Sequence, residues 1–200
     1  IVHLGDYIYE KGPDEKAVRQ HNGPEIYTID DYRNRYSLYK LDPALQAAHA
    51  AFPWIVTWDD HEVSNNYANA IHEKPETNPQ ADFLVRRAAG YQAYFEHMPL
   101  RRRAQPVGPD MSLYRRLPFG TLAEFNVLDT RQYRTDQPQG DGQKPFAPEL
   151  LNPMGSMLGA TQRDWLLDGL TRSKATWNVM AQQVMMAPAG RSTDGGPLLY

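Results

Sequence analysis

Three polar clusters, each directly after an apolar stretch, contain the side chains that could do chemistry. The first is Gly5–Glu10 (GDYIYE), which follows the apolar run Ile1–Leu4. A strand that ends in a glycine and an aspartate places a carboxylate at the carboxyl edge of a sheet, where open α/β sheets bind their ligands. Asp6 therefore points towards a site, and Tyr9 adds a phenol to the same point if the chain turns sharply after Gly5.

The chemistry that this first cluster favours is the binding of a hard cation. Oxygen ligands select hard metals, and a trivalent ion lowers the pKa of a phenol, so a carboxylate and a phenolate suit Fe³⁺. The structural alternative is that Tyr7 and Tyr9 are alternate residues on one face of a strand and that Asp6 begins a turn. Six residues alone leave both interpretations open.

The second cluster is Asp59–Asn66 (DDHEVSNN), which follows a β-branched and aromatic stretch, Trp54–Trp58. That stretch predicts a buried strand. Asp59 or Asp60 could simply be the N-cap of a solvated helix, but this accounts for only one residue of the cluster. Two strands that both end in an acidic polar cluster indicate a site built from several loops at one sheet edge.

The third cluster follows the predicted strand Thr121–Leu128 and begins with Asp129 and Arg131. A guanidinium group matches the oxygens of a phosphoryl group and stabilises their charge as a bond to phosphorus breaks. The alternative is that Asp129 and Arg131 pair with each other and fix the loop.

These clusters together resemble the PhoD-like alkaline phosphatases, a branch of the calcineurin-like metallophosphatases. The resemblance is carried by Leu4–Glu10, by Thr57–Glu62 with Asn65 and Asn66, by Leu128–Arg134, and further along by Trp165–Leu166 and Ala181–Gln183. It implies an α/β fold, a metallophosphatase-type four-layer α/β/β/α sandwich. This chain would be an incomplete portion of it, with the motif loops at the strand ends.

The resemblance also implies a function, the metal-dependent hydrolysis of phosphate monoesters or diesters with Fe³⁺ and Ca²⁺. Asp6 is then expected to bridge the two metals or to bind at the iron position, and Tyr9 is expected to bind iron as a phenolate. Asp60 is expected to bind a divalent ion, Ca²⁺. In the wider superfamily the second motif reads Gly-Asn-His-Asp/Glu, so Asp60 stands in the place of the metal-binding amide.

The same resemblance implies three residues that act on the substrate. His61 would protonate the leaving oxygen or orient the ester. Asn65 would contact a metal or the phosphate, and Arg131 would clamp the phosphoryl group. The partner of the protein is thus a phosphate-ester substrate.

The departures from the family pattern concern the ends of the chain. Metallophosphatases also take ligands from an Asp motif on the first strand and from late His motifs, and neither is present in residues 1–200. We expect these residues to be part of a single catalytic domain, truncated at both ends, whose activity in isolation is doubtful. The alternative function is a non-catalytic domain of the same fold that binds a metal or a partner.

Composition limits the other possibilities. A chain of 200 residues with 41% hydrophobic content suffices for one domain with a core. The net charge of −3 predicts no stable nucleic-acid binding, and Arg101–Arg103 is the densest basic run. The absence of cysteine excludes a thiolate nucleophile and a Cys-type zinc site within these residues. No window approaches the roughly 18 apolar residues that would span a bilayer.

Localisation follows from the resemblance alone. Members of the family are typically exported, so we expect an extracytoplasmic or secreted protein. The sequence begins with Ile1 rather than methionine, so no signal peptide is visible in it. Oligomeric state cannot be predicted from these residues.

The elements that must position the clusters can be read from periodicity and turn residues. We expect helices over 30–39, 44–51, 82–96 and 161–170, a hairpin of 113–117 with 121–128, a strand over 175–186, and loops over 11–27 and 135–159. Asp42 and Thr161 are the predicted N-caps, and the small residues of 44–51 predict close packing on a sheet. Gln182 and Gln183 are expected to be structural.

Overall fold

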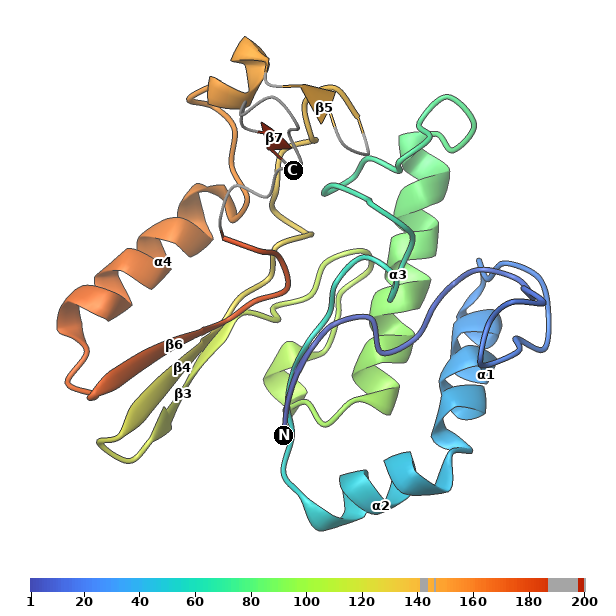
Figure 1. Cartoon of the computed structure of the whole chain (residues 1–200), viewed down its shortest axis with the longest axis horizontal. Helices are drawn as coiled ribbons and strands as arrows, with labels where there is room; N and C mark the ends of the chain where they lie inside the picture. The colour runs from blue at the N-terminus through green and yellow to red at the C-terminus, as the bar shows by residue number, and fades with distance from the viewer. Residues whose placement is uncertain (141–143, 146, 187–197, 200) are drawn as a thin grey trace.

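Short strands and longer helices give the chain a mixed α/β arrangement (Figure 1). The computed structural model describes residues 1–140, 144–145, 147–186 and 198–199. The α-helices are α1 (Ile29–Lys40), α2 (Pro43–Ala51), α3 (Gln80–His97) and α4 (Gly159–Arg172). The strands are β1 (Val2–Leu4), β2 (Ile55–Thr57), β3 (Arg115–Phe119), β4 (Ala123–Val127), β5 (Lys144–Pro145), β6 (Trp177–Ala181) and β7 (Leu198–Leu199).

Strands β1 and β2 pair in parallel, with Val2 opposite Ile55 and Leu4 opposite Thr57. Parallel strands have their carboxyl ends at the same edge of the sheet, so the polar segments that follow them leave side by side. The prediction that the first two clusters share one sheet edge is therefore confirmed.

Strands β3, β4 and β6 form a second sheet, in which β3 and β4 are antiparallel and β4 and β6 are parallel. The predicted hairpin is confirmed, but its turn lies after Phe119, because Pro118 and Phe119 still pair with β4. The predicted strand over 175–186 is shorter, since only Trp177–Ala181 pairs. The Thr57 hydroxyl donates to the carbonyl oxygen of Leu128 at 2.8 Å, which brings the ends of β2 and β4 together.

Helix α1 begins with a capping box, in which Thr28 and Asp31 satisfy each other's backbone N–H groups. It buries Tyr32 and Tyr36 on the side that faces α3. The largest buried ring, that of Trp58, stacks on Tyr91 of α3 with ring centroids 4.0 Å apart. The core therefore lies directly behind the segment that carries the second cluster.

Helix α2 begins as predicted, with the Asp42 side chain accepting hydrogen bonds from the N–H groups of Ala44 and Leu45. No residue of this fully described helix is buried, so the predicted close packing on a sheet is wrong. Leu45 packs against the edge of the core, and His49 stacks on Trp54 with ring centroids 4.0 Å apart.

Helix α4 begins earlier than predicted. Gly159, with φ at +68°, is its first residue, and its N–H donates to the Ser156 hydroxyl at 2.8 Å. Thr161 therefore lies within the first turn and is not the N-cap. The segment before α4, predicted as a loop, also contains β5 and a 3-10 turn at Pro148–Leu151.

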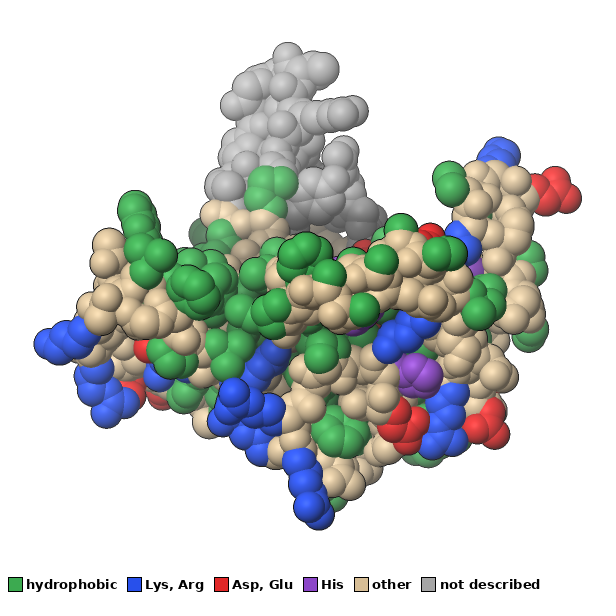
Figure 2. Space-filling model, turned by 90° about the horizontal axis from the view of Figure 1, so that it is seen from below, with side chains coloured by type: hydrophobic (Ala, Val, Ile, Leu, Met, Phe, Trp, Pro, Cys, Tyr) green, Lys and Arg blue, Asp and Glu red, His purple; other side chains and the backbone are tan. Residues whose placement is uncertain are grey.

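The described sheets contain only part of the four-layer sandwich that the resemblance implies, so the complete sandwich stays a prediction. None of the helices in the described ranges combines the length and apolar character needed to cross a bilayer. On the face seen in Figure 2, Lys and Arg side chains lie among acidic and apolar ones, in keeping with the small net charge of −3.

Candidate metal and phosphate site

The two loops that follow β1 and β2 cross in contact at Gly5. A Cβ atom added to Gly5 would lie 2.3 Å from the backbone nitrogen of Asp59 and 2.5 Å from its Cβ. The next residue, Asp6, has φ at +57°, a left-handed conformation that costs a non-glycine residue about 1–2 kcal/mol. Strain of this kind persists where the surrounding structure enforces it, commonly at functional sites.

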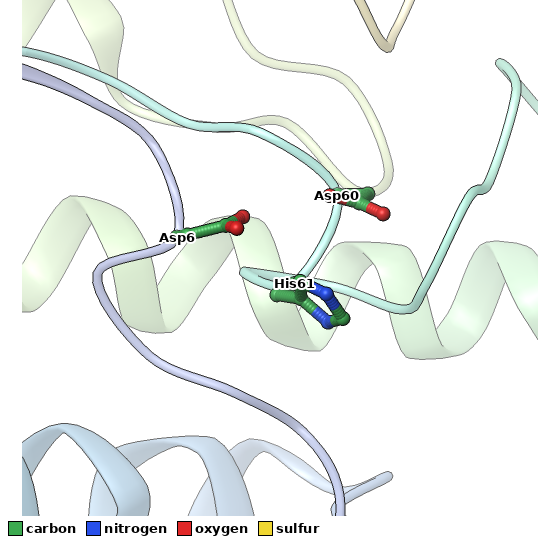
Figure 3. Close-up of side chains that lie close together, drawn as sticks. All are labelled: Asp6, Asp60 and His61. Atoms are coloured by element: carbon green, nitrogen blue, oxygen red, sulfur yellow. The ribbon is translucent and has the colours of Figure 1, made fainter. Parts of the chain in front are cut away.

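The crossing brings Asp6 to Asp60 and His61. One potential ligand atom of each residue lies within 4.8 Å of those of the other two. Figure 3 shows Asp6 projecting from its loop towards Asp60 and His61 on the other loop. The Asp6 Oδ2 atom accepts a hydrogen bond from the Tyr9 hydroxyl at 2.9 Å. Of the three side chains predicted to bind metal, Asp6 and Asp60 are therefore neighbours, and Tyr9 is hydrogen-bonded to Asp6.

The donors present fit a metal ion. The Asp6 Oδ1 atom is buried and has no hydrogen-bond partner among the described residues. A buried acceptor without a partner costs about 1–3 kcal/mol, which a bound cation would offset. The carboxylate oxygens of Asp6 and Asp60 and the phenol oxygen of Tyr9 suit a hard cation.

Asp60 is held in its ionised form. Burial alone would raise the pKa of its carboxyl group, but the charges of Arg131 and His61 and a hydrogen bond from the Asn66 N–H keep that pKa below its ordinary value. The Asn66 N–H donates to Asp60 Oδ2 at 2.7 Å. An ionised carboxylate in this place is ready to act as a ligand.

The His61 ring is fixed by a carboxylate from the first loop. Glu10 Oε2 lies 2.6 Å from His61 Nδ1, and Glu10 Oε1 accepts a hydrogen bond from the Asn65 N–H at 2.9 Å. The Tyr9 ring covers the imidazole, with centroids 4.2 Å apart. Because Glu10 occupies Nδ1, Nε2 is the nitrogen available to a ligand or substrate.

The charge of His61 follows from this contact. Burial favours the neutral ring, but the hydrogen bond and the negative charge of Glu10 outweigh it and raise the pKa of His61 above its usual value. The ring therefore keeps its proton to a higher pH than a free imidazole. Sequence reasoning gave Glu10 no role, although its place beside Tyr9 in the first motif was a signal.

Glu62 is a second carboxylate that sequence reasoning left without a role. It is fully buried, and its two oxygens accept hydrogen bonds from the N–H of Tyr7 at 2.5 Å and the N–H of Asp59 at 2.7 Å. Burial raises its pKa to about 8. Glu62 therefore joins the backbones of the two loops immediately beside Asp6 and Asp60.

The two charged residues of the third cluster, Asp129 and Arg131, have different partners. Asp129 is fully buried and accepts hydrogen bonds from the Trp58 indole at 3.0 Å and from the backbone N–H groups of Arg131 and Gln132. The Arg131 guanidinium instead donates to Asp59 at 2.6 Å and lies 3.6 Å from Asp60. Asp129 thus shapes the loop without pairing with the Arg131 guanidinium, which lies at the carboxylates of the second cluster.

Asn65 is placed differently from the other predicted site residues. Its side-chain amide donates to Glu73, and its backbone N–H donates to Glu10. The structure therefore brings its backbone, but not its amide, into the network around His61. Its predicted contact with metal or phosphate stays a prediction.

Two glutamines support the site from behind. Gln162 of α4 bonds to both the N–H and the carbonyl oxygen of Asp129, at 2.9 and 2.8 Å. Gln183 accepts from the Thr130 hydroxyl and donates to the carbonyl oxygen of Trp58, which agrees with its predicted structural role. Gln162 was missed, although an amide on the apolar side of a helix was a signal.

Comparison with known proteins gives consistent results. A sequence model of the family described as PhoD-like phosphatase matches residues 1–198. Alkaline phosphatase D of Bacillus subtilis (strain 168) is 55% identical over 203 residues, an alignment that covers 99% of this chain and 34% of that protein. A solved structure described as "Structure of PhoD" matches with a TM-score of 0.94 at 55% identity, over 99% of this chain and 38% of that one. The chain therefore spans about a third of the length of the relative it matches.

Proposed function

This chain belongs to the PhoD-like phosphatase family, and from that premise we propose that its polar cluster is part of the site of a metal-dependent phosphate-ester hydrolase. The observation that carries the proposal is the group formed by Asp6, Asp60 and His61, with ligand atoms within 4.8 Å and a buried Asp6 oxygen that lacks a described partner. Its two carboxylates follow parallel strands, where such folds bind ligands.

We propose that Asp6 and Tyr9 hold Fe³⁺ and that Asp60 holds Ca²⁺. A metal pair in such a site lowers the pKa of a bound water and neutralises the charge of the phosphoryl oxygens. Burial and the hydrogen bond to Asp6 raise the pKa of the Tyr9 phenol. A bound trivalent cation would lower that pKa and would let Tyr9 bind as a phenolate. The 2.9 Å contact between Tyr9 and Asp6 supports the assignment of both residues to one ion.

The remaining residues act on the ester. Arg131, with its guanidinium at Asp59 and Asp60, is suited to bind the phosphoryl oxygens and stabilise their charge as the phosphorus–oxygen bond breaks. His61 gives its Nε2 proton to the leaving alcohol oxygen, and the Glu10 carboxylate stabilises the protonated ring before this transfer. The raised pKa of His61 supports this role, because the donor must be protonated at the start.

The finer assignments are proposals of the same kind. We propose that both phosphate monoesters and diesters are candidate substrates and that residues 1–200 lie in one catalytic domain of the metallophosphatase sandwich. We also propose an extracytoplasmic location. These assignments rest on family membership and on the length of the relative, of which this chain covers 34%.

The proposed function is tested on the complete gene product with two substrates, phenyl phosphate and p-nitrophenyl phosphate. His61→Asn is expected to slow the hydrolysis of phenyl phosphate by roughly 10²–10⁴-fold, the usual contribution of a positioned general acid. The loss should be smaller with p-nitrophenyl phosphate, because p-nitrophenolate leaves readily without a proton. His21→Asn, in the loop over 11–27, is the matched control and should keep full activity.

Two results would contradict the proposal. A wild-type protein that hydrolyses neither ester, with its metals present, would remove the enzyme interpretation and favour a non-catalytic domain. Equal losses on both esters in His61→Asn would leave a hydrolase but remove the assigned proton transfer.

A further inference from the structure

One arginine differs from the others that are not fully exposed. Each of the others donates to a carboxylate, a carbonyl oxygen or another side chain; they are Arg19, Arg33, Arg35, Arg86, Arg87, Arg115, Arg116 and Arg131. Arg134 has no hydrogen bond or ion pair to any part of the chain that the structure describes, and its Nε atom is buried. Such a guanidinium group is a candidate for binding an external anion.

Arg134 lies close enough to the candidate site to interact with its charges. Burial lowers the pKa of Arg134, and the positive charge of Arg131 lowers it further, while the carboxylates of Asp59, Asp136 and Asp60 act in the opposite direction. Two guanidinium groups that repel each other across a partly buried space are both stabilised by an anion that contacts them. Arg131 has its own carboxylate partner at 2.6 Å, whereas Arg134 has none among the residues that the structure describes.

Arg134 also lines a cavity of about 440 Å³. This volume is within the range of small-molecule sites. The wall combines polar residues, Thr135 and Ser156, with apolar ones, Leu150 and Met154. Such a mixture suits an organic group that carries a charged substituent.

Gln137, which also lines the cavity, contacts the end of the second cluster. The Gln137 side chain donates to the carbonyl oxygen of Asn66 at 3.0 Å, and the Asn66 N–H donates to Asp60. The rim of the cavity therefore begins where the loop that carries Asp60 ends.

We propose that Arg134 and this cavity form a subsite for the organic part of the phosphate ester, in which Arg134 binds a negatively charged group on that part. The proposal rests on the proposed function, because it assigns the substrate class of the same site: esters whose organic group carries a carboxylate or a second phosphate. Asp136 and Glu149 also line the cavity, but both are exposed, so solvent screens their charges more than that of the buried Arg134 Nε.

A pair of ligands that differ only in charge tests the subsite. We would measure the binding of 4-carboxybenzylphosphonate and 4-carbamoylbenzylphosphonate to the complete gene product by calorimetry. Neither compound has a phosphate ester to hydrolyse. The carboxylate compound is expected to bind about tenfold tighter, the effect of one charge-assisted hydrogen bond. In Arg134→Gln this ratio should fall to about one, and Arg134→Lys should keep part of it.

Arg163→Gln is the matched control, because Arg163 is an exposed arginine of α4 that pairs with Asp164 and does not line the cavity as described. It should keep the wild-type ratio. A wild-type ratio near one would overturn the subsite without use of any variant, and so would an unchanged ratio in a folded Arg134→Gln protein. Turnover of phenyl phosphate is measured in parallel: hydrolysis without charge discrimination would remove the subsite alone, whereas discrimination without hydrolysis would remove the proposed function alone.

Discussion

Replacing Gly5 with alanine should separate the two loops that carry the candidate site. Gly5 has φ at +101°, and an added Cβ would lie 2.3 Å from the backbone nitrogen of Asp59 and 2.8 Å from the carbonyl carbon of Trp58. Because these neighbours are backbone atoms, no side chain can rotate to make room. One or both loops must move.

The expected cost can be worked out from two contributions. A non-glycine residue in this backbone region costs about 1–3 kcal/mol. Forced overpacking against fixed atoms adds about 1–3 kcal/mol. The free energy of unfolding should therefore fall by about 2–6 kcal/mol, a large share of the roughly 5–15 kcal/mol that stabilises a typical domain.

The free energy of unfolding is measured by urea unfolding. Two other glycines separate these two contributions in that assay. Gly108 has φ at +59° but open space around its Cα, so Gly108→Ala should show only the backbone cost, about 1–2 kcal/mol. Gly23 has open space and no positive φ, so Gly23→Ala should change stability by less than about 1 kcal/mol. The reasoning is refuted if Gly5→Ala is no more destabilising than Gly108→Ala, since the contact between the loops would then have no energetic weight.

Three further predictions concern groups whose contacts are internal. Glu10→Gln should lower the pKa of His61 and slow phenyl phosphate hydrolysis about tenfold, because a charge-assisted bond of about 1–2 kcal/mol becomes neutral. The pKa is measured by NMR titration of the ring, and an unchanged pKa would contradict this prediction. Asp129→Asn should destabilise the protein to urea by about 2–4 kcal/mol, since an amide cannot accept every N–H that Asp129 accepts, and a loss under 1 kcal/mol would oppose this. Burial lowers the pKa of His49, so the unfolded chain binds its proton more readily and stability falls as the pH drops below about 6.5; His49→Gln should make that decline shallower, and an equal slope would argue against it.

The sequence predicted the position of the site better than it predicted the residues that hold the site in place. Apolar runs that end in Asp6, Asp60 and Asp129 indicated strands with a common carboxyl edge, and the parallel pairing of β1 and β2 confirms this for the first two. Such patterns are local, since a strand and the polar segment after it are read from consecutive residues. The family was identified from the same segments.

The site residues are held in place by contacts between residues that are distant in the chain. The bond of Glu10 to His61 joins residues 51 positions apart, and Glu62 joins the N–H of Tyr7 from 55 positions away. Periodicity carries no information on such pairs, because they depend on how the loops cross in three dimensions. The Asn65 amide is a similar case, since its turn towards Glu73 depends on the path of the segment after it.

The start of α4 shows a limit of a different kind. Thr161 with Asp164 has the spacing of a capping box, yet the helix begins at Gly159. A Cβ atom added to Gly159 would lie 3.1 Å from the Cβ atom of Tyr133, so the backbone at Gly159 packs closely on that residue. We infer that this tertiary contact sets the start of the helix. A local capping signal is overruled where the preceding chain is already fixed by packing.

The binding of metal by Asp6, Tyr9 and Asp60 is tested most directly by the metal content and visible spectrum of the complete gene product and its Tyr9→Phe variant. Tyr27→Phe, at an exposed tyrosine, is the matched control. We expect iron and calcium in the wild type, with a visible tyrosinate band that Tyr27→Phe keeps and Tyr9→Phe loses. A colourless wild type without bound iron or calcium would contradict the account.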